Sequence, residues 1–160
     1  MTDAVYCLCS SEPQANAILT HLRSAGFSSE ISVLLQERAK TKNISVKEDA
    51  VRGAKIGGIV GALLALAVPG LGAALAVGPI LAALGGAASG GAVGGLAGGS
   101  GAFKPLGLPE SVSRRLHERI RAGYILIAVH SDDAHERETA TRIFKAEGAD
   151  DIYEQGRRAA

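Results

Sequence analysis

The stretch Tyr124-Ile125-Leu126-Ile127-Ala128-Val129 decides the fold that this sequence predicts. It directly follows Gly123, a residue type that commonly ends helices. The stretch is short and almost entirely apolar on both of its alternating faces, which is typical of a strand buried on both sides. We therefore expect it at the centre of a sheet.

The segments around this strand follow the order β-α-β twice, apart from one additional helix. This is the split order of the ferredoxin-like fold, whose first and third strands are central. The two most apolar strands of the sequence occupy those two places. We therefore expect an α/β (α+β) ferredoxin-like domain made from residues 1–35 and 105–160. Its expected elements are a strand at 4–9, a helix between Ser11 and Gly26, a strand at 31–35, the additional helix at 109–122, the strand at 124–129, a helix between Asp132 and Gly148, and a last strand at 152–153.

Such a sheet leaves one face without a helix, because its two crossover helices lie on the same side. An apolar third strand, however, requires cover on both sides. The helix 109–122, a second subunit, or both are expected to supply it.

A long uncharged segment separates the two halves of this domain. The 48 residues between Lys55 and Lys104 carry no charge, and glycine and alanine make up 28 of them. Residues 36–55 form a charged lead-in, and residues 56–103 are predicted to be a hydrophobic glycine-zipper helical hairpin inserted between the second and third strands. Small residues four positions apart line one side of a helix and let another helix approach closely. The expected packing and oligomerisation residues are Gly57, Gly61, Gly78, Ala82, Gly86, Gly90, Gly94, Gly98, Gly91 and Gly95.

This hairpin needs a partner or a membrane, because each internal glycine costs about 1 kcal/mol of helix stability relative to alanine. Basic residues flank it on both sides, which places both flanks in the cytoplasm by the positive-inside rule. We expect the chain at the inner (cytoplasmic) membrane, with the soluble domain in the cytoplasm; a cytoplasmic location is the alternative. The expected membrane-flanking residues are Lys47, Arg52, Lys55, Lys104, Arg114 and Arg115.

Two motifs around the insertion resemble a bacterial family of general-stress and low-temperature-induced proteins with a glycine-zipper centre. The first runs from Ala67-Val68-Pro69-Gly70-Leu71-Gly72 into the glycine rows. The second is Leu106-Gly107-Leu108-Pro109-Glu110 followed by Arg121-Ala122-Gly123-Tyr124-Ile125-Leu126-Ile127-Ala128-Val129. The resemblance implies an association with stress and proximity to a membrane, and it implies no catalytic residues.

The sequence offers little for catalysis or for binding a cofactor. Cys7 and Cys9 lack the spacing of a metal site, and the four histidines add no ligand motif. The 17 Lys and Arg residues balance 16 Asp and Glu residues, which argues against nucleic acid as a partner. We expect no enzyme, no cofactor, no metal and no small-molecule substrate.

Three functions remain open at this point. The first is a non-enzymatic, membrane-associated, self-assembling stress-response protein, whose partners are copies of itself and membrane lipid. The second is a soluble homo-oligomeric scaffold, such as a cage, ring or filament, in which the hairpins bury one another. The third is a sensor of a small ligand or a metal, anchored by the hairpin.

Overall fold

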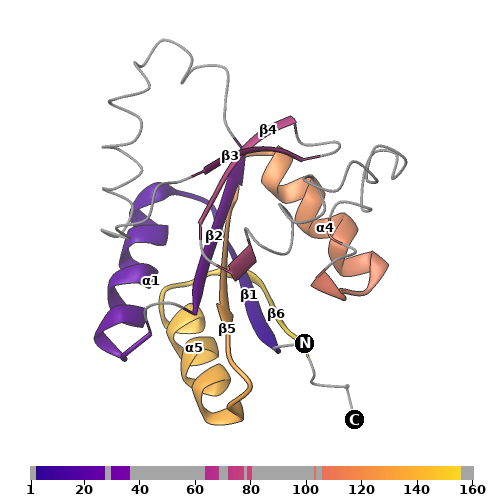
Figure 1. Ribbon diagram of the computed structural model, residues 1–160. Helices are drawn as coiled ribbons and strands as arrows, with labels where there is room; N and C mark the ends of the chain where they lie inside the picture. The colour runs from indigo at the N-terminus through magenta and orange to yellow at the C-terminus, as the bar shows by residue number, and fades with distance from the viewer. Residues whose placement is uncertain are drawn as a thin grey trace.

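The structure, a computed structural model, describes residues 3–27, 30–36, 64–68, 72–77, 79–80, 103 and 106–155. Within these ranges it contains a six-stranded sheet and three helices (Figure 1). The elements in chain order are β1 (Ala4–Cys9), α1 (Glu12–Ser24), β2 (Ile31–Gln36), β3 (Leu64–Val68), β4 (Gly72–Val77), α4 (Glu110–Arg121), β5 (Ile125–His130), α5 (Ala134–Ala146) and β6 (Asp150–Glu154).

The strands lie in the order β3-β4-β2-β5-β1-β6, and every neighbouring pair is antiparallel. The prediction of a mixed α/β fold is therefore confirmed. β1 and β5, the two most apolar strands in the sequence, lie side by side, with Tyr6 opposite Ala128. β1 and β2 point the same way, as the β-α-β crossover predicts, with β5 between them.

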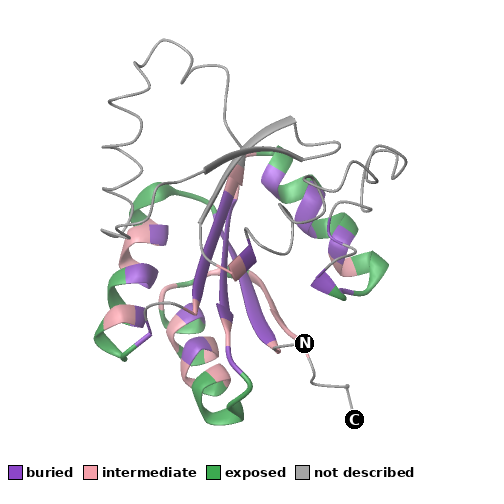
Figure 2. Cartoon of the chain, in the orientation of Figure 1, coloured by how far each residue is buried: buried purple, intermediate pink, exposed green. Residues whose placement is uncertain are grey.

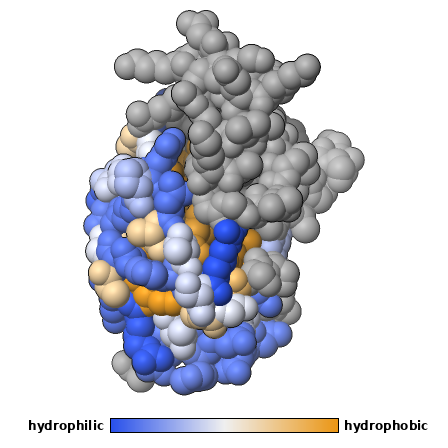
Figure 3. All heavy atoms as spheres, turned by 90° about the vertical axis from the view of Figure 1, so that its left-hand side faces the viewer, coloured by the Kyte–Doolittle hydropathy of each residue, from blue (hydrophilic) through white to orange (hydrophobic). Residues whose placement is uncertain are grey.

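Helices α1 and α5 cover one face of the sheet. Ser11 caps α1 by accepting a hydrogen bond from the Gln14 backbone N–H, and Gly26, with φ of +99°, follows its end. The two helices bury one apolar side each and leave the outer side exposed (Figure 2), and the described residues on this side of the molecule are mostly hydrophilic (Figure 3). The fully buried residues beneath them include Val5, Cys7, Cys9, Ile18, Leu19, Leu22, Ile127, Val129, Ala140 and Phe144.

Helix α4 covers the opposite face, together with Ile80 and Phe103 of the insertion and with Leu106 and Leu108 of the segment after it. This core cluster, here called the α4 core, contains Tyr6, Leu8, Leu34, Ile80, Phe103, Leu106, Leu108, Leu116, Ile120, Leu126 and Ala128. The chain itself therefore covers both faces of its central strands, and the helix expected at 109–122 contributes to that cover.

The helical prediction for the insertion is wrong for residues 64–68 and 72–77, which form the antiparallel pair β3 and β4. β4 also pairs with β2, from Val33 opposite Val77 to Gln36 opposite Ala74. The edge of β2 supplies hydrogen-bond partners for the backbone of β4. A helix through this part of the sequence would be weak, because internal glycines lower helix stability and Pro69 has no backbone N–H to donate. Apart from residues 79–80 and 103, the rest of the predicted hairpin lies outside the described residues. This includes residues 81–102, which are called the Gly/Ala-rich arm below, and Ile80 and Phe103 are the described residues that flank it.

Candidate functional site

Arg114 and Arg115 are the predicted site residues that the structure describes. The other expected membrane-flanking residues (Lys47, Arg52, Lys55 and Lys104) lie outside the described ranges, as do all the small residues expected to mediate packing: Gly57, Gly61, Gly78, Ala82, Gly86, Gly90, Gly91, Gly94, Gly95 and Gly98. The described residues nearest to the predicted site are therefore Ile80 and Phe103, which flank the Gly/Ala-rich arm, and the residues of the neighbouring helix α4.

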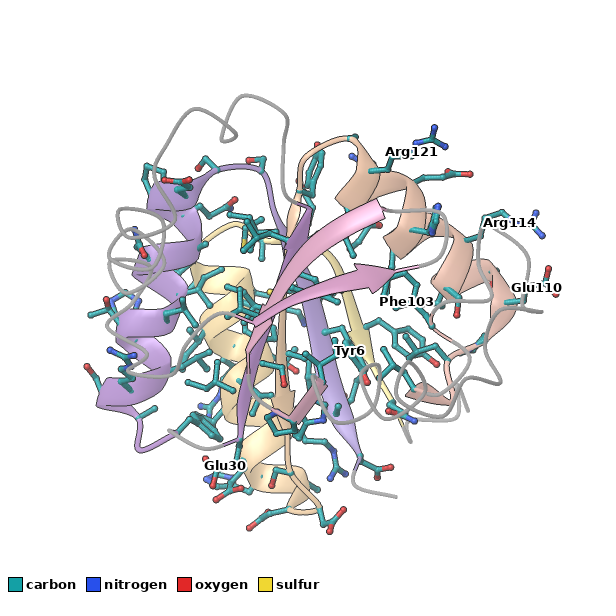
Figure 4. The ribbon with its side chains drawn as sticks, turned by 45° about the horizontal axis from the view of Figure 1, so that its top comes forward. Tyr6, Glu30, Phe103, Glu110, Arg114 and Arg121 are labelled. Atoms are coloured by element: carbon teal, nitrogen blue, oxygen red, sulfur yellow. The ribbon has the colours of Figure 1, made fainter. Side chains whose placement is uncertain are left out.

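The outer side of α4 is exposed and rich in arginine. Arg114 and Arg121 point away from the sheet, whereas Phe103 lies between the sheet and α4 (Figure 4). Arg114 pairs with Glu110 at 2.9 Å, and Arg115 pairs with Asp151 at 3.2 Å, in both cases between nitrogen and oxygen atoms. Both arginine side chains remain 64% exposed, so water screens these pairs and leaves their charge accessible.

A second polar cluster joins the end of α4 to the sheet. Asp151 has φ of +46°, an uncommon conformation for a residue other than glycine, and it also faces Arg119 at 3.5 Å. The guanidinium of Arg119 lies 5.0 Å from the ring centre of Tyr124 and donates a hydrogen bond to its hydroxyl at 3.0 Å. These contacts fasten α4 to β6 and to the start of β5.

Ile80 is held in the α4 core by a buried polar contact. Its backbone N–H donates to the hydroxyl oxygen of Ser32 at 2.9 Å, and that hydroxyl also lies 2.9 Å from Nε2 of His130. Ser32 and Ile80 are both fully buried. Burial lowers the pKa of His130 below its ordinary value of 6.5, so the neutral ring is the favoured form.

Phe103 packs against a second histidine. Its ring meets the ring of His117 edge to face, with 6.5 Å between the centroids. His117 is only 6% exposed, and its Nδ1 has no hydrogen-bond partner among the described residues. Desolvation lowers the pKa of His117, and the positive charge of Arg121 lowers it further.

Tyr6 belongs to the same core cluster as Ile80 and Phe103. Its ring lies edge-on to His130 with centroids 6.3 Å apart, and its hydroxyl lies 3.4 Å from Oε1 of Gln155. Gln155 donates in turn to the carbonyl of Leu106 at 2.9 Å. Burial raises the pKa of Tyr6 to about 12, so the phenol stays neutral at physiological pH.

The cysteines lie on the opposite face of the sheet, against α1 and α5. Cys7 and Cys9 are both fully buried, and burial raises the pKa of the Cys7 thiol well above its ordinary range. A neutral, inaccessible thiol is a poor nucleophile and a poor metal ligand. Within the described ranges, no group of three or more His, Cys, Asp or Glu side chains is placed to hold a metal ion.

Two further observations bear on function. Comparison of the chain with protein-family models, with curated proteins and with solved structures gave no match. Among the described residues, no helix combines the length and apolarity that crossing a bilayer requires.

The sequence prediction missed the residues that hold the ends of the arm, although two signals were present. Ser32 interrupts an otherwise aliphatic run in Ile31–Leu35, and such a lone polar residue in a buried strand needs a hydrogen-bond partner. His117 directly follows the buried Leu116 in α4. The partners of both residues lie far away in the sequence, so the contacts themselves were not visible.

Proposed function

We propose that this chain is a non-enzymatic stress-response protein that attaches to the cytoplasmic side of the inner membrane and assembles with copies of itself. In this proposal, the α/β domain has a ferredoxin-like core made of β1, α1, β2, β5, α5 and β6. The strand order β2-β5-β1-β6, with both crossover helices on one face, supports that assignment. The stress role rests on the sequence resemblance described above.

One observation limits how this chain could attach to a membrane: Ile80 and Phe103 belong to the same buried core. The 22 residues between them would extend about 33 Å as one straight helix, enough to cross the hydrocarbon core of a bilayer. The two ends of such a helix would lie about 33 Å apart, whereas Ile80 and Phe103 both lie in the α4 core. A single straight crossing of the membrane is therefore inconsistent with the shared position of Ile80 and Phe103 in one core.

The charge on α4 supports attachment at the membrane surface. Phe103, at the end of the arm, contacts α4 through His117, and Lys104 follows it directly. Anionic lipid attracts arginine near the membrane surface by about 1 kcal/mol per residue. The exposed side of α4 would then lie against the headgroups.

Vesicle flotation tests the proposal. We expect the purified chain to float with vesicles of phosphatidylcholine mixed with phosphatidylglycerol, and to bind vesicles of phosphatidylcholine alone more weakly. Replacing Arg114→Glu together with Arg121→Glu should lower binding to the anionic vesicles at least about tenfold. The control, Arg142→Glu with Lys145→Glu, makes the same charge change on exposed positions of α5. No binding to either vesicle, or an equal loss in the control, would refute this attachment.

A soluble scaffold is the second candidate, and the edges of the sheet favour it. β6 protects one edge with acidic residues and an irregular register, whereas β3 at the other edge has the uncharged sequence Leu-Ala-Leu-Ala-Val. Uncharged edge strands tend to pair with another chain. Light scattering tests this candidate in the absence of vesicles. A particle of high mass that Leu66→Lys abolishes would favour the soluble scaffold over membrane attachment.

A further inference from the structure

The two described ends of the Gly/Ala-rich arm are each held in place through a histidine. Ile80 is linked to His130 through Ser32, and Phe103 packs directly on His117. The remaining histidines, His21 and His135, lie on α1 and α5 at the other face of the sheet and are exposed. The chain thus places two of its four histidines where the arm joins the core.

A neutral His130 ring can complete the hydrogen bonds that the structure describes at Ser32. The Ile80 N–H uses the Ser32 oxygen as its acceptor, so the Ser32 O–H requires an acceptor of its own. Nε2 of a neutral His130 ring provides it at 2.9 Å. A protonated ring carries hydrogen on both nitrogens, which leaves the Ser32 hydroxyl hydrogen without an acceptor among its described partners and puts a charge beside the core.

Phe103 and His117 are in direct ring-to-ring contact. The ring of Phe103 covers His117, and the unpartnered Nδ1 is already shielded from water. Protonation would place a cation in this site without a counter-ion hydrogen-bonded to it, and Arg121 on the same helix adds repulsion. Displacing Phe103 gives the imidazolium access to water.

We propose that acidification frees Ile80 and Phe103 from the α4 core by protonating His130 and His117. This release does not depend on the proposed function. Protons bind the released state more tightly than the seated state, so lowering the pH below about 6.5 favours release.

The charged groups around the two histidines do not reverse the lowering of their pKa values. Asp3 and Glu30 precede the strands on either side of His130, and Tyr6 faces its ring, yet burial is the effect that sets the direction of the pKa shift of His130. Around His117, Glu118 opposes the effect of Arg121 on the pKa, and desolvation exceeds both. The sheet beneath α4 contributes apolar side chains and the neutral phenol of Tyr6.

Amide hydrogen exchange at Ile80 measures the release without any substitution. After correction for the intrinsic exchange rate, we expect the protection factor of the Ile80 amide to be constant above about pH 7 and to fall below about pH 6.5, at most about tenfold per pH unit for each linked proton. The Leu19 amide in α1 serves as the internal reference, because it reports opening of the other core.

A tryptophan at residue 103 provides a second readout, because the chain contains no tryptophan of its own. The emission of Phe103→Trp should shift to longer wavelength as the pH falls over the same range. His130→Gln keeps an acceptor for Ser32 but does not titrate, and His117→Leu keeps an apolar contact for residue 103. Each change should remove part of the pH response, and both together should abolish it.

The matched control is His21→Gln with His135→Gln, which removes two exposed histidines and should leave the response intact. A response that persists in the His117→Leu, His130→Gln double variant, or one that the control abolishes, would overturn the proposal. A protection factor at Ile80 that does not change with pH would do so as well. Because these measurements need no vesicles, failure of flotation alone would refute the membrane attachment and leave the release intact.

Discussion

Ser32 shows how a single buried hydroxyl joins two distant parts of this chain. It satisfies the backbone N–H of Ile80, 48 positions later in the sequence, within a fully buried environment. Ser32→Ala should lower the free energy of unfolding by about 1–3 kcal/mol, because it leaves a buried donor without a partner. Urea unfolding measures this loss, and Ser24→Ala, which removes an exposed hydroxyl bonded within its own helix, should change stability by less than about 0.5 kcal/mol. Equal stability of Ser32→Ala and the parent would contradict the assignment.

Tyr6 makes the stability of the protein sensitive to alkaline pH. Its pKa is raised from 10.0 to about 12 in the folded chain, so the unfolded chain loses this proton first as the pH rises. The stabilisation is complete below about pH 10 and is lost as the pH rises toward about 12, with a total of about 2–3 kcal/mol. Urea unfolding across this range should show a steeper decline for the parent than for Tyr6→Phe. An equally steep decline in Tyr6→Phe would assign the effect to other groups, and Tyr124→Phe, which alters a half-buried ring, should behave like the parent.

At the scale of elements, α4 stabilises the sheet by covering its second face. Leu116 is 2% exposed and Ile120 fully buried, whereas Val112 on the same side of the helix is only partly buried. Leu116→Ala should destabilise the fold by about 2–5 kcal/mol, because it removes apolar burial and leaves a cavity. Val112→Ala, at the margin of the cluster, should have less than half that effect. Similar losses in urea unfolding for the two variants would show that α4 packs differently.

At the scale of the whole molecule, the domain and the arm should be separable. Ile80 and Phe103 lie in one core, so a short Gly/Ser linker in place of residues 82–101 should bridge them with little loss of stability, because loop-closure entropy depends only weakly on loop length. The free energy of unfolding of the shortened chain, measured in urea, should lie within about 1 kcal/mol of that of the parent. The shortened chain should also lose flotation with anionic vesicles. A collapse of stability would mean that the arm forms part of the core, and retained flotation would assign membrane binding to α4 alone.

The local sequence pattern was sufficient to predict most of the helices and strands of the α/β domain. The apolar runs at 4–9 and 124–129 predicted the two central strands, and the caps and glycines predicted α1, α4 and α5, because strand alternation, helix periodicity and capping depend on residues close together in the chain. The apolar character of β5 on both faces also indicated that the sheet is covered on both sides. These features were fixed by the sequence alone.

Tertiary structure decided the rest. Leu64–Val68 and Gly72–Val77 have no strong local preference, and they became strands because β2 presented an open edge to which β4 could bond. The contacts at Ile80 and Phe103 join residues that are separated by 48 and by 14 positions from Ser32 and His117, and only the folded sheet brings them together. The burial that lowers the pKa of His117 and His130 arises from the same packing, since desolvation is a property of the assembled core and not of the local sequence.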